Sequence, residues 1–501
     1  MQNYLGFRTG HSMSDLERIV AEYEDNLVSY YVGREYFLDR ALSRDDLKSI
    51  FYGPKGVGKS AILQMVKLEE RSRGNEQRVI SITPDDLAFN ALSNLETTSP
   101  LLSDVKKRDF VFKSLWNYVL CTEILSREFQ GYNAVEGLFT KILGSKNKAE
   151  QKKLIDITLG DDGTPASLTA KMLSLVEAVQ ISGGTPDGSS ITGRLEVGES
   201  NVEQNMELLQ LINQVTKKLS DNLTHEYYVL IDDLDLDWDG SLLQSEFIGA
   251  MFHSIRKLSK DTRSVKFVVS LRKEIYREID LSHRDKFRDF VEEVRWSKQL
   301  IMAIIEERVA FVLSCSPEQV WGKLFPDGAF EFLYDLTGGM PREMIRVSVS
   351  CIKAALGDIG RTSVQASDIN EGVKAFSEQR LDDLGSDFRF QYPRLSLVCK
   401  LFRGMKKEFD SEAIETVSYK LIEKLGDDPA ELEWATSGVE SPLLLARTLL
   451  RTGFLLFKAG RSDYARIPEE DDITLLERSN WFAIHPMYQA GLGLDGYNRF
   501  S

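Results

Sequence analysis

A glycine-rich octapeptide near the start of the chain has the spacing G-x-x-x-x-G-K-[ST] of a phosphate-binding loop. Its residues are Gly53, Pro54, Lys55, Gly56, Val57, Gly58, Lys59 and Ser60, and Ala61 follows them. The glycines let the backbone curl so that successive N–H groups point at one anion. Lys59 is placed to reach the outer phosphates of a nucleotide, and the Ser60 hydroxyl to bind Mg²⁺. The pattern therefore predicts a nucleotide site.

An acidic pair follows a buried-strand pattern later in the chain, where the apolar run 227–231 ends in Asp232 and Asp233. We expect this strand to lie beside the strand of the phosphate loop, because ligands bind at the carboxyl ends of such strands. Asp232 is placed to hold Mg²⁺ through water, and Asp233 to orient or deprotonate an attacking water. Next to a phosphate loop, we favour this interpretation over a buried strand that ends in an acidic turn.

Residues 264–272 form another strand pattern, and polar side chains stand at its end. Of these, Arg272 can meet a γ-phosphate or pair with a nearby acid such as Glu274, and the sequence leaves both readings open. The stretch 235–240, followed by Glu246, also matches the spacing of a calcium loop. An EF-hand needs a helix entering that loop, whereas a strand enters it in this chain. We therefore interpret the stretch as an acidic loop at the rim of the nucleotide site.

These residues need an α/β core to position them. Short apolar strand patterns occur at residues 49–52, 78–83, 227–231, 264–272 and 291–296. Helical patterns alternate with them, which is typical of a parallel sheet with helices on both faces. The sequence thus predicts the α/β fold of a P-loop NTPase core over 46–296, preceded by a helical segment over 1–45.

A long insertion, about 90–220, separates the second and third strand patterns. We expect it to contain helices near 104–129, 167–180 and 202–220, a Gly/Ser-rich loop at 183–190 and a short strand at 191–197. Its sequence contains no set of residues with the types and spacing of a catalytic or binding site.

Residues 297–376 have helical patterns throughout and are expected to form a lid. Ser297 is a helix cap, and the next marked feature is Gly338-Gly339-Met340-Pro341-Arg342, where one helix ends and another begins. A polar stretch at 384–387 is interpreted as a linker. Helices near 392–408, 411–425 and 442–452, then strand patterns at 454–457 and 481–488, give the order of a winged helix over 377–501.

Composition restricts the function classes. The chain has 501 residues, which is enough for several domains, and a formal net charge of -15. That charge argues against broad, sequence-independent binding of nucleic acid, which needs many cations. The four cysteines are scattered and have no metal-binding spacing, which favours a reducing compartment. With no signal pattern and no apolar run that could span a membrane, we expect a cytoplasmic protein.

Five motifs together resemble the STAND/AAA+-type bacterial P-loop ATPases, with an origin-recognition-like core and lid. They are Gly33-Arg34-Glu35, the phosphate loop, Asp232-Asp233, the pair Ser270 and Arg272, and Gly339-Met340-Pro341-Arg342. The resemblance covers about 31–375. It implies that Gly33 and Arg34 fold over the adenine of ATP, that Ser270 is a polar sensor, that Pro341 packs near the base and that Arg342 touches phosphate.

Three further residues have two readings each. Arg447 and Arg451 lie four apart on one helix face, where they can meet DNA phosphates or bind the acidic ATPase body; the charge balance favours the second reading. In STAND proteins a winged-helix histidine contacts the bound diphosphate. We favour a packed core histidine for His485, because its spacing fits that role loosely.

The resemblance implies an ATP-binding and ATP-hydrolysing regulatory ATPase that controls a partner or an assembly, and it suggests a role in prokaryotic anti-phage defence or a stress response. Asp233 stands where fast AAA+ motors have glutamate, which favours a switch or a slow ATPase. Partners are expected to be further copies of the chain, an effector protein on another chain, or both, and a neighbouring copy can supply Arg284, Arg288 or Arg295. The rival functions are a DNA-binding initiator or loader and a nucleotide-holding scaffold.

Overall fold

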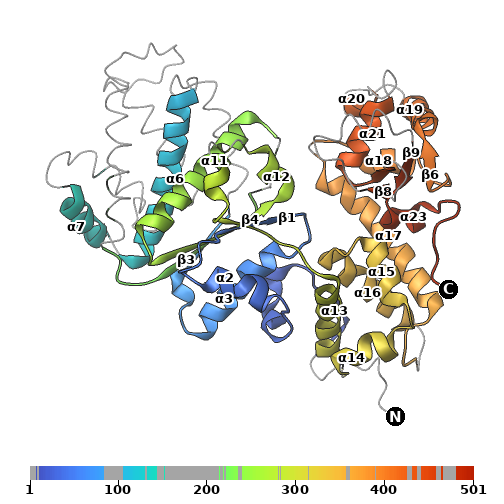
Figure 1. The fold of residues 1–501 in the computed structure, drawn as a ribbon, viewed down its shortest axis with the longest axis horizontal. Helices are drawn as coiled ribbons and strands as arrows, with labels where there is room; N and C mark the ends of the chain where they lie inside the picture. Colours follow the sequence, from blue (N-terminus) through green and yellow to red (C-terminus); the bar gives the residue numbers. More distant parts are fainter. Residues whose placement is uncertain are drawn as a thin grey trace, which may run out of the picture. The chain divides into compact units, whose positions relative to one another are not determined.

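The computed structural model describes most of residues 7–83, 105–143, 222–356, 361–465 and 481–501, together with a few isolated positions. The predicted elements at 167–180, 183–190 and 191–197, and nearly all of 202–220, lie outside these residues. The chain forms two compact units (Figure 1). We call Gly33–Arg295 the sheet unit and Met1–Val32 with Trp296–Ser501 the lid unit. The predicted limits of four domains stay a prediction.

The sheet unit is built on five parallel strands in the order β2-β3-β4-β1-β5. Their bounds are β1 Ile50–Gly53, β2 Val79–Ile82, β3 Tyr227–Ile231, β4 Val265–Arg272 and β5 Val291–Glu293. All five lie at the predicted positions, so the α/β class is confirmed. The expected neighbours of β3 were wrong, because β4 lies between β1 and β3. The first seven residues of β4 are buried, as a central strand of a covered parallel sheet requires.

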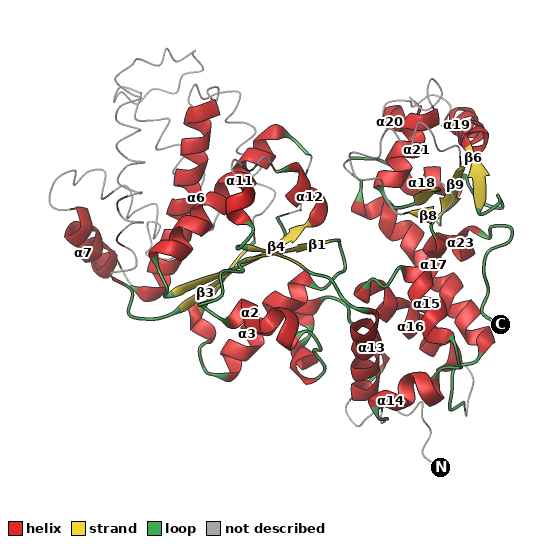
Figure 2. Ribbon diagram, viewed as in Figure 1, coloured by secondary structure: helices red, strands yellow, loops and turns green. Residues whose placement is uncertain are grey.

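Helices cover both faces of this sheet (Figures 1 and 2). α2 (Asp39–Leu42) and α3 (Lys59–Ser72) lie on one face, and α6 (Val105–Glu128) and α11 (Leu242–Asp261) lie on the other. The remaining described helices of the unit are η3 (Arg34–Leu38), η4 (Glu76–Arg78), α7 (Tyr132–Leu143), α12 (Lys273–Glu278) and η6 (Arg284–Phe287). Strand residues alternate between the faces, and Ile231 and Val269 pack on the α6 and α11 side.

The described part of the insertion belongs to the core of the sheet unit. α6 confirms the helix predicted near 104–129, and its Phe112 and Trp116 are fully buried. The Trp116 indole N–H donates to the main-chain oxygen of Phe247 on α11 at 2.9 Å. The rings of Phe112 and Phe247 meet edge to face, with centroids 5.4 Å apart. This segment therefore stabilises the sheet rather than standing apart from it.

Helices dominate the first part of the lid unit, as predicted. They are α13 (Lys298–Val312), α14 (Pro317–Gln319), η7 (Val320–Leu324), α15 (Ala329–Thr337), α16 (Pro341–Leu356) and α17 (Ala366–Asp387). Ser297 caps α13, since its hydroxyl accepts the Leu300 N–H at 3.3 Å. α15 ends at the left-handed Gly338, and Pro341 is the first residue of α16.

The linker expected at 384–387 was wrong, because these residues form the last turn of α17. Leu384 is buried, which anchors the turn to the core. A Cβ at Gly385 would lie 2.9 Å from the Cβ of Ser396, so glycine allows the helix to pack closely there. The helix thus runs unbroken through the limit predicted at residue 376.

The described residues between 395 and 492 form a winged-helix-like module, within the region 377–501 for which it was predicted. Its described elements are α18 (Leu395–Lys400), β6 (Glu408–Asp410), α19 (Ser411–Leu425), α20 (Glu433–Thr436), α21 (Pro442–Arg451), β7 (Leu455–Lys458), β8 (Tyr464–Ala465), β9 (Trp481–Ile484) and α23 (Pro486–Leu492). The strands pair antiparallel in the order β6-β9-β7-β8. The first helix is shorter than the predicted 392–408, and β6 was not predicted. Only Phe409 of β6 is apolar and buried, so the sequence holds no strand alternation there.

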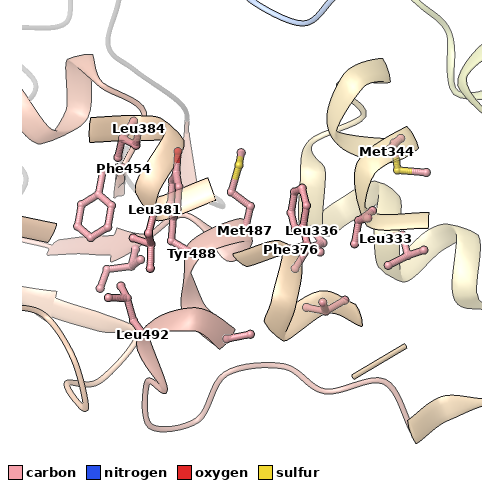
Figure 3. Close-up of a cluster of buried hydrophobic side chains, with 14 of the residues drawn as sticks. Leu333, Leu336, Met344, Phe376, Leu381, Leu384, Phe454, Met487, Tyr488 and Leu492 are labelled. Carbon is pink, nitrogen blue, oxygen red and sulfur yellow. The ribbon is translucent and has the colours of Figure 1, made fainter. Parts of the chain in front are cut away.

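One hydrophobic core joins the lid helices to the winged-helix module (Figure 3). The labelled side chains come from α15, α16 and α17, and from Phe454 and α23 of the module. A Cβ at Gly491 would lie 2.8 Å from the main-chain nitrogen of Glu378, so α23 packs directly on the α17 backbone. The two parts therefore form one body. None of the helices within the described residues is long and apolar enough to cross a membrane.

The N-terminal segment also belongs to the lid unit. Instead of long helices it has α1 (Met13–Glu17), η1 (Ala21–Tyr23) and η2 (Asp25–Ser29). Leu16 is fully buried in the lid core. The Arg308 guanidinium of α13 lies 2.9 Å from the Glu24 carboxylate, and both residues are buried. A buried ion pair thus fastens the segment to the lid.

Candidate nucleotide site

The phosphate loop has the backbone that its glycines predict. Gly56 and Gly58 adopt the left-handed φ values of 82° and 100°, which other residues rarely accept. A Cβ at Gly53 would lie 2.9 Å from Val57 Cγ1, so the turn closes too tightly for a side chain. Gly58 is the residue before α3, and the first turn of that helix begins at Lys59. Its free N–H groups and dipole favour an anion at this point.

Lys59 lies inside the loop. The side chain is buried, and its ammonium group donates to the main-chain oxygens of Gly53 and Pro54 at 3.0 Å each. The positive charge is therefore held within the curve of the loop. Ser60 follows in the first turn of α3, as the magnesium hypothesis requires. Lys55 is exposed on the same loop.

The predicted sensor strand is the one that brings the loop and the acidic pair together. In the sheet register, Arg272 lies beside Gly53, and Ser270 lies beside Phe51. On the other side of β4, Val269 pairs with Ile231, so Asp232 comes level with Ser270. Val269 and Ile231 face α6 and α11. Because side chains alternate along a strand, Asp232, Ser270 and Arg272 point to the α3 face. Lys59, Asp232, Ser270 and Arg272 thus gather at one edge of the sheet.

Asp233 has an unusual backbone. Its φ of 57° is left-handed, a conformation that only one other non-glycine residue of the described chain adopts. Its N–H donates to Oδ1 of Asp232 at 3.0 Å. Aspartate tolerates this conformation better than residues with longer side chains do. The local backbone thus gives a physical reason for an aspartate at this position.

The Gly33-Arg34 segment packs against the helix of the phosphate loop. The Arg34 guanidinium pairs with the Glu69 carboxylate on α3 and lies 3.8 Å from Asp39. Gly33 has a negative φ, and its carbonyl oxygen accepts the Phe37 N–H at 3.0 Å. Sequence reasoning did not find Glu69, because a surface glutamate on a helix gives no signal of its partner.

The three arginines proposed to act on a neighbouring copy have different surroundings. Arg284 donates to three main-chain oxygens at the end of α12, and its guanidinium lies 5.2 Å from the centre of the Tyr276 ring. Arg295 pairs with Glu293 at 2.5 Å, and Arg288 is exposed. Arg284 and Arg295 are therefore both held by groups of their own unit, and a role on a neighbouring copy stays a prediction for all three arginines.

Pro341 and Arg342 belong to the lid unit and are described within it. Gly339 has a φ of 66°, and a Cβ there would lie 2.6 Å from the Tyr334 ring. Tyr334 thus supports the backbone just ahead of Pro341. Nε of Arg342 is buried and has no hydrogen-bond partner among the described residues.

The winged-helix candidates are now placed within their module. His485 is 4% exposed, and its Nδ1 accepts the Met487 N–H at 3.3 Å. It thus caps α23 as a packed core histidine. On α21, Arg447 is half-buried and Arg451 is exposed.

A magnesium ion fits the sheet-unit donors only together with phosphate. Within the described residues, no group of three or more His, Cys, Asp or Glu side chains could hold a metal ion. The Ser60 hydroxyl and the Asp232 carboxylate are oxygen donors of the kind Mg²⁺ prefers, and Mg²⁺ commonly completes its shell with water and substrate phosphates. Of the calcium-like stretch, 235–237 and 239 lie outside the described residues.

Comparison with known proteins finds remote similarities. The model of the FunZ-associated C-terminal helical domain matches residues 298–385, which run from α13 almost to the end of α17. The "Putative transposon gamma-delta 80.3 kDa protein" of Escherichia coli (strain K12) is 22% identical over 91% of this chain. The chain spans 64% of that relative's length. "Allergen Alt a 2" of Alternaria alternata is 25% identical over 26% of this chain and 74% of its own length.

Among solved structures, the Aeropyrum pernix ORC1 protein in complex with DNA aligns with a TM-score of 0.42 and 13% identity. The alignment covers 96% of this chain and 97% of that one. At this TM-score the likeness carries no conclusion about this chain.

Proposed function

We propose that this chain binds ATP with Mg²⁺ and hydrolyses it slowly, as a switch that controls a partner. The observation that supports the proposal best is the edge of the sheet where the phosphate loop, Asp232, Ser270 and Arg272 gather. Phosphoryl transfer to water needs positioning and charge neutralisation more than covalent chemistry, and this edge offers both. Control of further copies of the chain, or of an effector on another chain, follows from the resemblance in the sequence and is part of the same proposal, as is a role in prokaryotic defence.

In this mechanism the residues divide the work. Lys59 exchanges the oxygens of Gly53 and Pro54 for phosphate oxygens. Ser60, and Asp232 through water, would hold Mg²⁺, which neutralises charge on the phosphates. Arg272 adds a cation at the strand end. Asp233 orients the attacking water or accepts its proton.

The proposed switch acts on the lid and the winged helix together. α17 runs through the limit predicted at residue 376, and the lid helices share one hydrophobic core with the winged-helix module. The chain passes between the two units after Val32 and after Arg295. We therefore assign nucleotide-dependent movement to these two connections rather than to residues 377–387.

The direct test replaces Lys59 with Ala, beside Lys260→Ala as a control. Lys260 is exposed near the end of α11, so its loss should leave nucleotide binding unchanged. Equilibrium binding of a fluorescent ATP analogue and phosphate release would be measured with Mg²⁺ on both variants. Lys59→Ala should lose binding or turnover. Equal ATP turnover in Lys59→Ala and the wild-type protein would refute the assignment.

A second candidate function is DNA binding by the winged helix. Arg451 is exposed on α21, and the name of the E. coli relative refers to a transposon. The test compares duplex-DNA binding of the wild-type protein and Arg447→Ala/Arg451→Ala at several salt concentrations. Salt-dependent binding that the variant loses would support this function, because phosphate contacts release counterions. Without such binding, the arginines would be assigned to protein contacts.

A further inference from the structure

One carboxylate links three elements of the sheet unit at the point where the phosphate loop leaves the sheet. Glu293 is the last residue of β5. Its Oε1 accepts a hydrogen bond from Lys273 Nζ at 2.9 Å, and its Oε2 lies 2.5 Å from an Arg295 guanidinium nitrogen. The Tyr52 hydroxyl makes a longer contact with Oε2 at 3.5 Å. The side chain is 19% exposed, so the contacts are partly shielded from water.

Each partner of Glu293 lies next to a residue of the proposed nucleotide site or at the boundary of the sheet unit. Lys273 follows Arg272 at the end of β4, and Tyr52 precedes Gly53, the first residue of the loop. Arg295 is the last residue of the sheet unit. The carboxylate therefore connects the strand end that bears Arg272 with the chain that enters the lid unit.

The bridge is charged. Burial opposes ionisation of Glu293, but the hydrogen bonds from Arg295 and Lys273 outweigh it and lower the pKa of the carboxyl group. Charge-assisted bonds of this kind are stronger than neutral ones. Tyr52 also stacks on Tyr276 of α12, with ring centroids 4.2 Å apart, so the strand before the loop and the helix after Arg272 are in contact.

The neighbouring glutamate of β5 provides a matched comparison. Glu292 points to the other face, where it lies 2.8 Å from Arg40 and 3.6 Å from Lys48. Its side chain is 23% exposed, close to the value for Glu293. Both of these partners lie in the segment before β1, and neither lies at the end of β4. Glu292 thus resembles Glu293 in burial and charge, but it contacts different elements.

We propose that Glu293 is a positioning residue that transmits the nucleotide state of the sheet unit to the connection at Arg295–Trp296. The inference rests on the proposed function, since it needs ATP to bind at the loop. When Arg272 and the loop take up phosphate, the end of β4 and Lys273 shift with them. The Lys273–Glu293–Arg295 bridge passes that shift to the chain entering the lid. The size of this response depends on how much more stable the bridge is with ATP bound than without it.

The experiment follows hydrogen exchange of main-chain amides in residues 294–300 of the full chain, with and without ATP and Mg²⁺. Binding of a fluorescent ATP analogue is measured in parallel. In the wild-type protein, ATP should slow exchange in this segment. Glu293→Gln should reduce that ATP-dependent change about fivefold or more, the lower end of typical coupling between sites, while ATP affinity changes less than about threefold. Glu292→Gln should keep the full response.

A second variant separates coupling from folding. Arg295 is 73% exposed, so Arg295→Gln removes one arm of the bridge without threatening the core. It should lose the response as Glu293→Gln does, and Lys273→Met combined with Glu293→Gln should lose no more than Glu293→Gln alone. A full ATP response in both Glu293→Gln and Arg295→Gln overturns the inference alone. A wild-type protein that binds no ATP overturns the proposed function and this inference with it.

Discussion

The buried ion pair between Glu24 and Arg308 should fix the N-terminal segment to the lid unit. The two residues are 3% and 5% exposed, and their side chains lie 2.9 Å apart. The Arg308 guanidinium also donates to the main-chain oxygens of Asp15 and Arg18, and it lies 5.3 Å from the Tyr30 ring. The Arg308 side chain therefore contacts four residues of the N-terminal segment. Glu24→Leu would leave this guanidinium buried without its counter-ion.

Removing one partner of a buried pair costs about 3–5 kcal/mol, because the remaining charge stays desolvated. We therefore expect Glu24→Leu to lower the free energy of opening of α13 by about this amount. At about 1.4 kcal/mol per factor of ten, amide exchange in α13 should become roughly 100-fold faster or more when exchange follows the opening equilibrium. Native-state hydrogen exchange of peptides from 301–312 measures this directly.

An exposed pair in the same unit supplies the control. Lys353 Nζ lies 2.6 Å from Glu17, but the two side chains are 65% and 42% exposed. Lys353→Ala should therefore change the opening free energy by less than about 1 kcal/mol. The double variant Glu24→Leu/Arg308→Met should recover part of the loss, since it leaves no buried charge. If Glu24→Leu loosens α13 no more than Lys353→Ala does, the ion pair does not anchor the segment.

Two further predictions concern the sheet unit. Asp233→Asn should retain ATP binding and lower ATP turnover about 100-fold or more, and turnover equal to that of the wild-type protein would contradict this. Asp233→Glu should be less stable than Asp233→Asn by about 1 kcal/mol because of the left-handed backbone, and equal stability of the two variants in urea unfolding would contradict this. Lys266 is buried and its pKa is lowered to about 8, chiefly by burial, so the unfolded chain binds more protons between pH 8 and 10.5. The wild type should therefore gain up to about 3 kcal/mol of stability relative to Lys266→Met over that range, and a pH-independent difference in urea unfolding would refute the burial argument.

The features that the sequence predicted are those with a local signal. The phosphate loop, its helix and the five strands each follow from a run of a few residues, because glycine spacing and apolar runs report backbone needs directly. The order of the strands does not, since an apolar strand looks the same wherever it lies in a covered sheet. For that reason β4 could not be placed between β1 and β3 from the sequence alone.

Ion pairs between residues far apart in the sequence also could not be predicted. Glu24 and Arg308 are 284 residues apart, and Arg34 and Glu69 are 35 apart; no pattern within either segment points to the other. The error at 384–387 had a different cause, because Gly-Ser-Asp composition normally indicates a linker. In this fold, burial of Leu384 against the lid core overrides that local preference.

The connections between the units constrain how the proposed switch can work. The chain enters the sheet unit at Gly33, one residue before Arg34, which pairs with Glu69 on the phosphate-loop helix. It leaves after Arg295, which is held by Glu293. The first connection is thus attached to the phosphate-loop helix, and the second to β5. A lid on one flexible chain could rotate independently of the loop, whereas two attached chains restrict its motion. Because the lid helices and the winged-helix module share one hydrophobic core, the proposed switch would make the state of the phosphate loop available to a partner that contacts the winged helix.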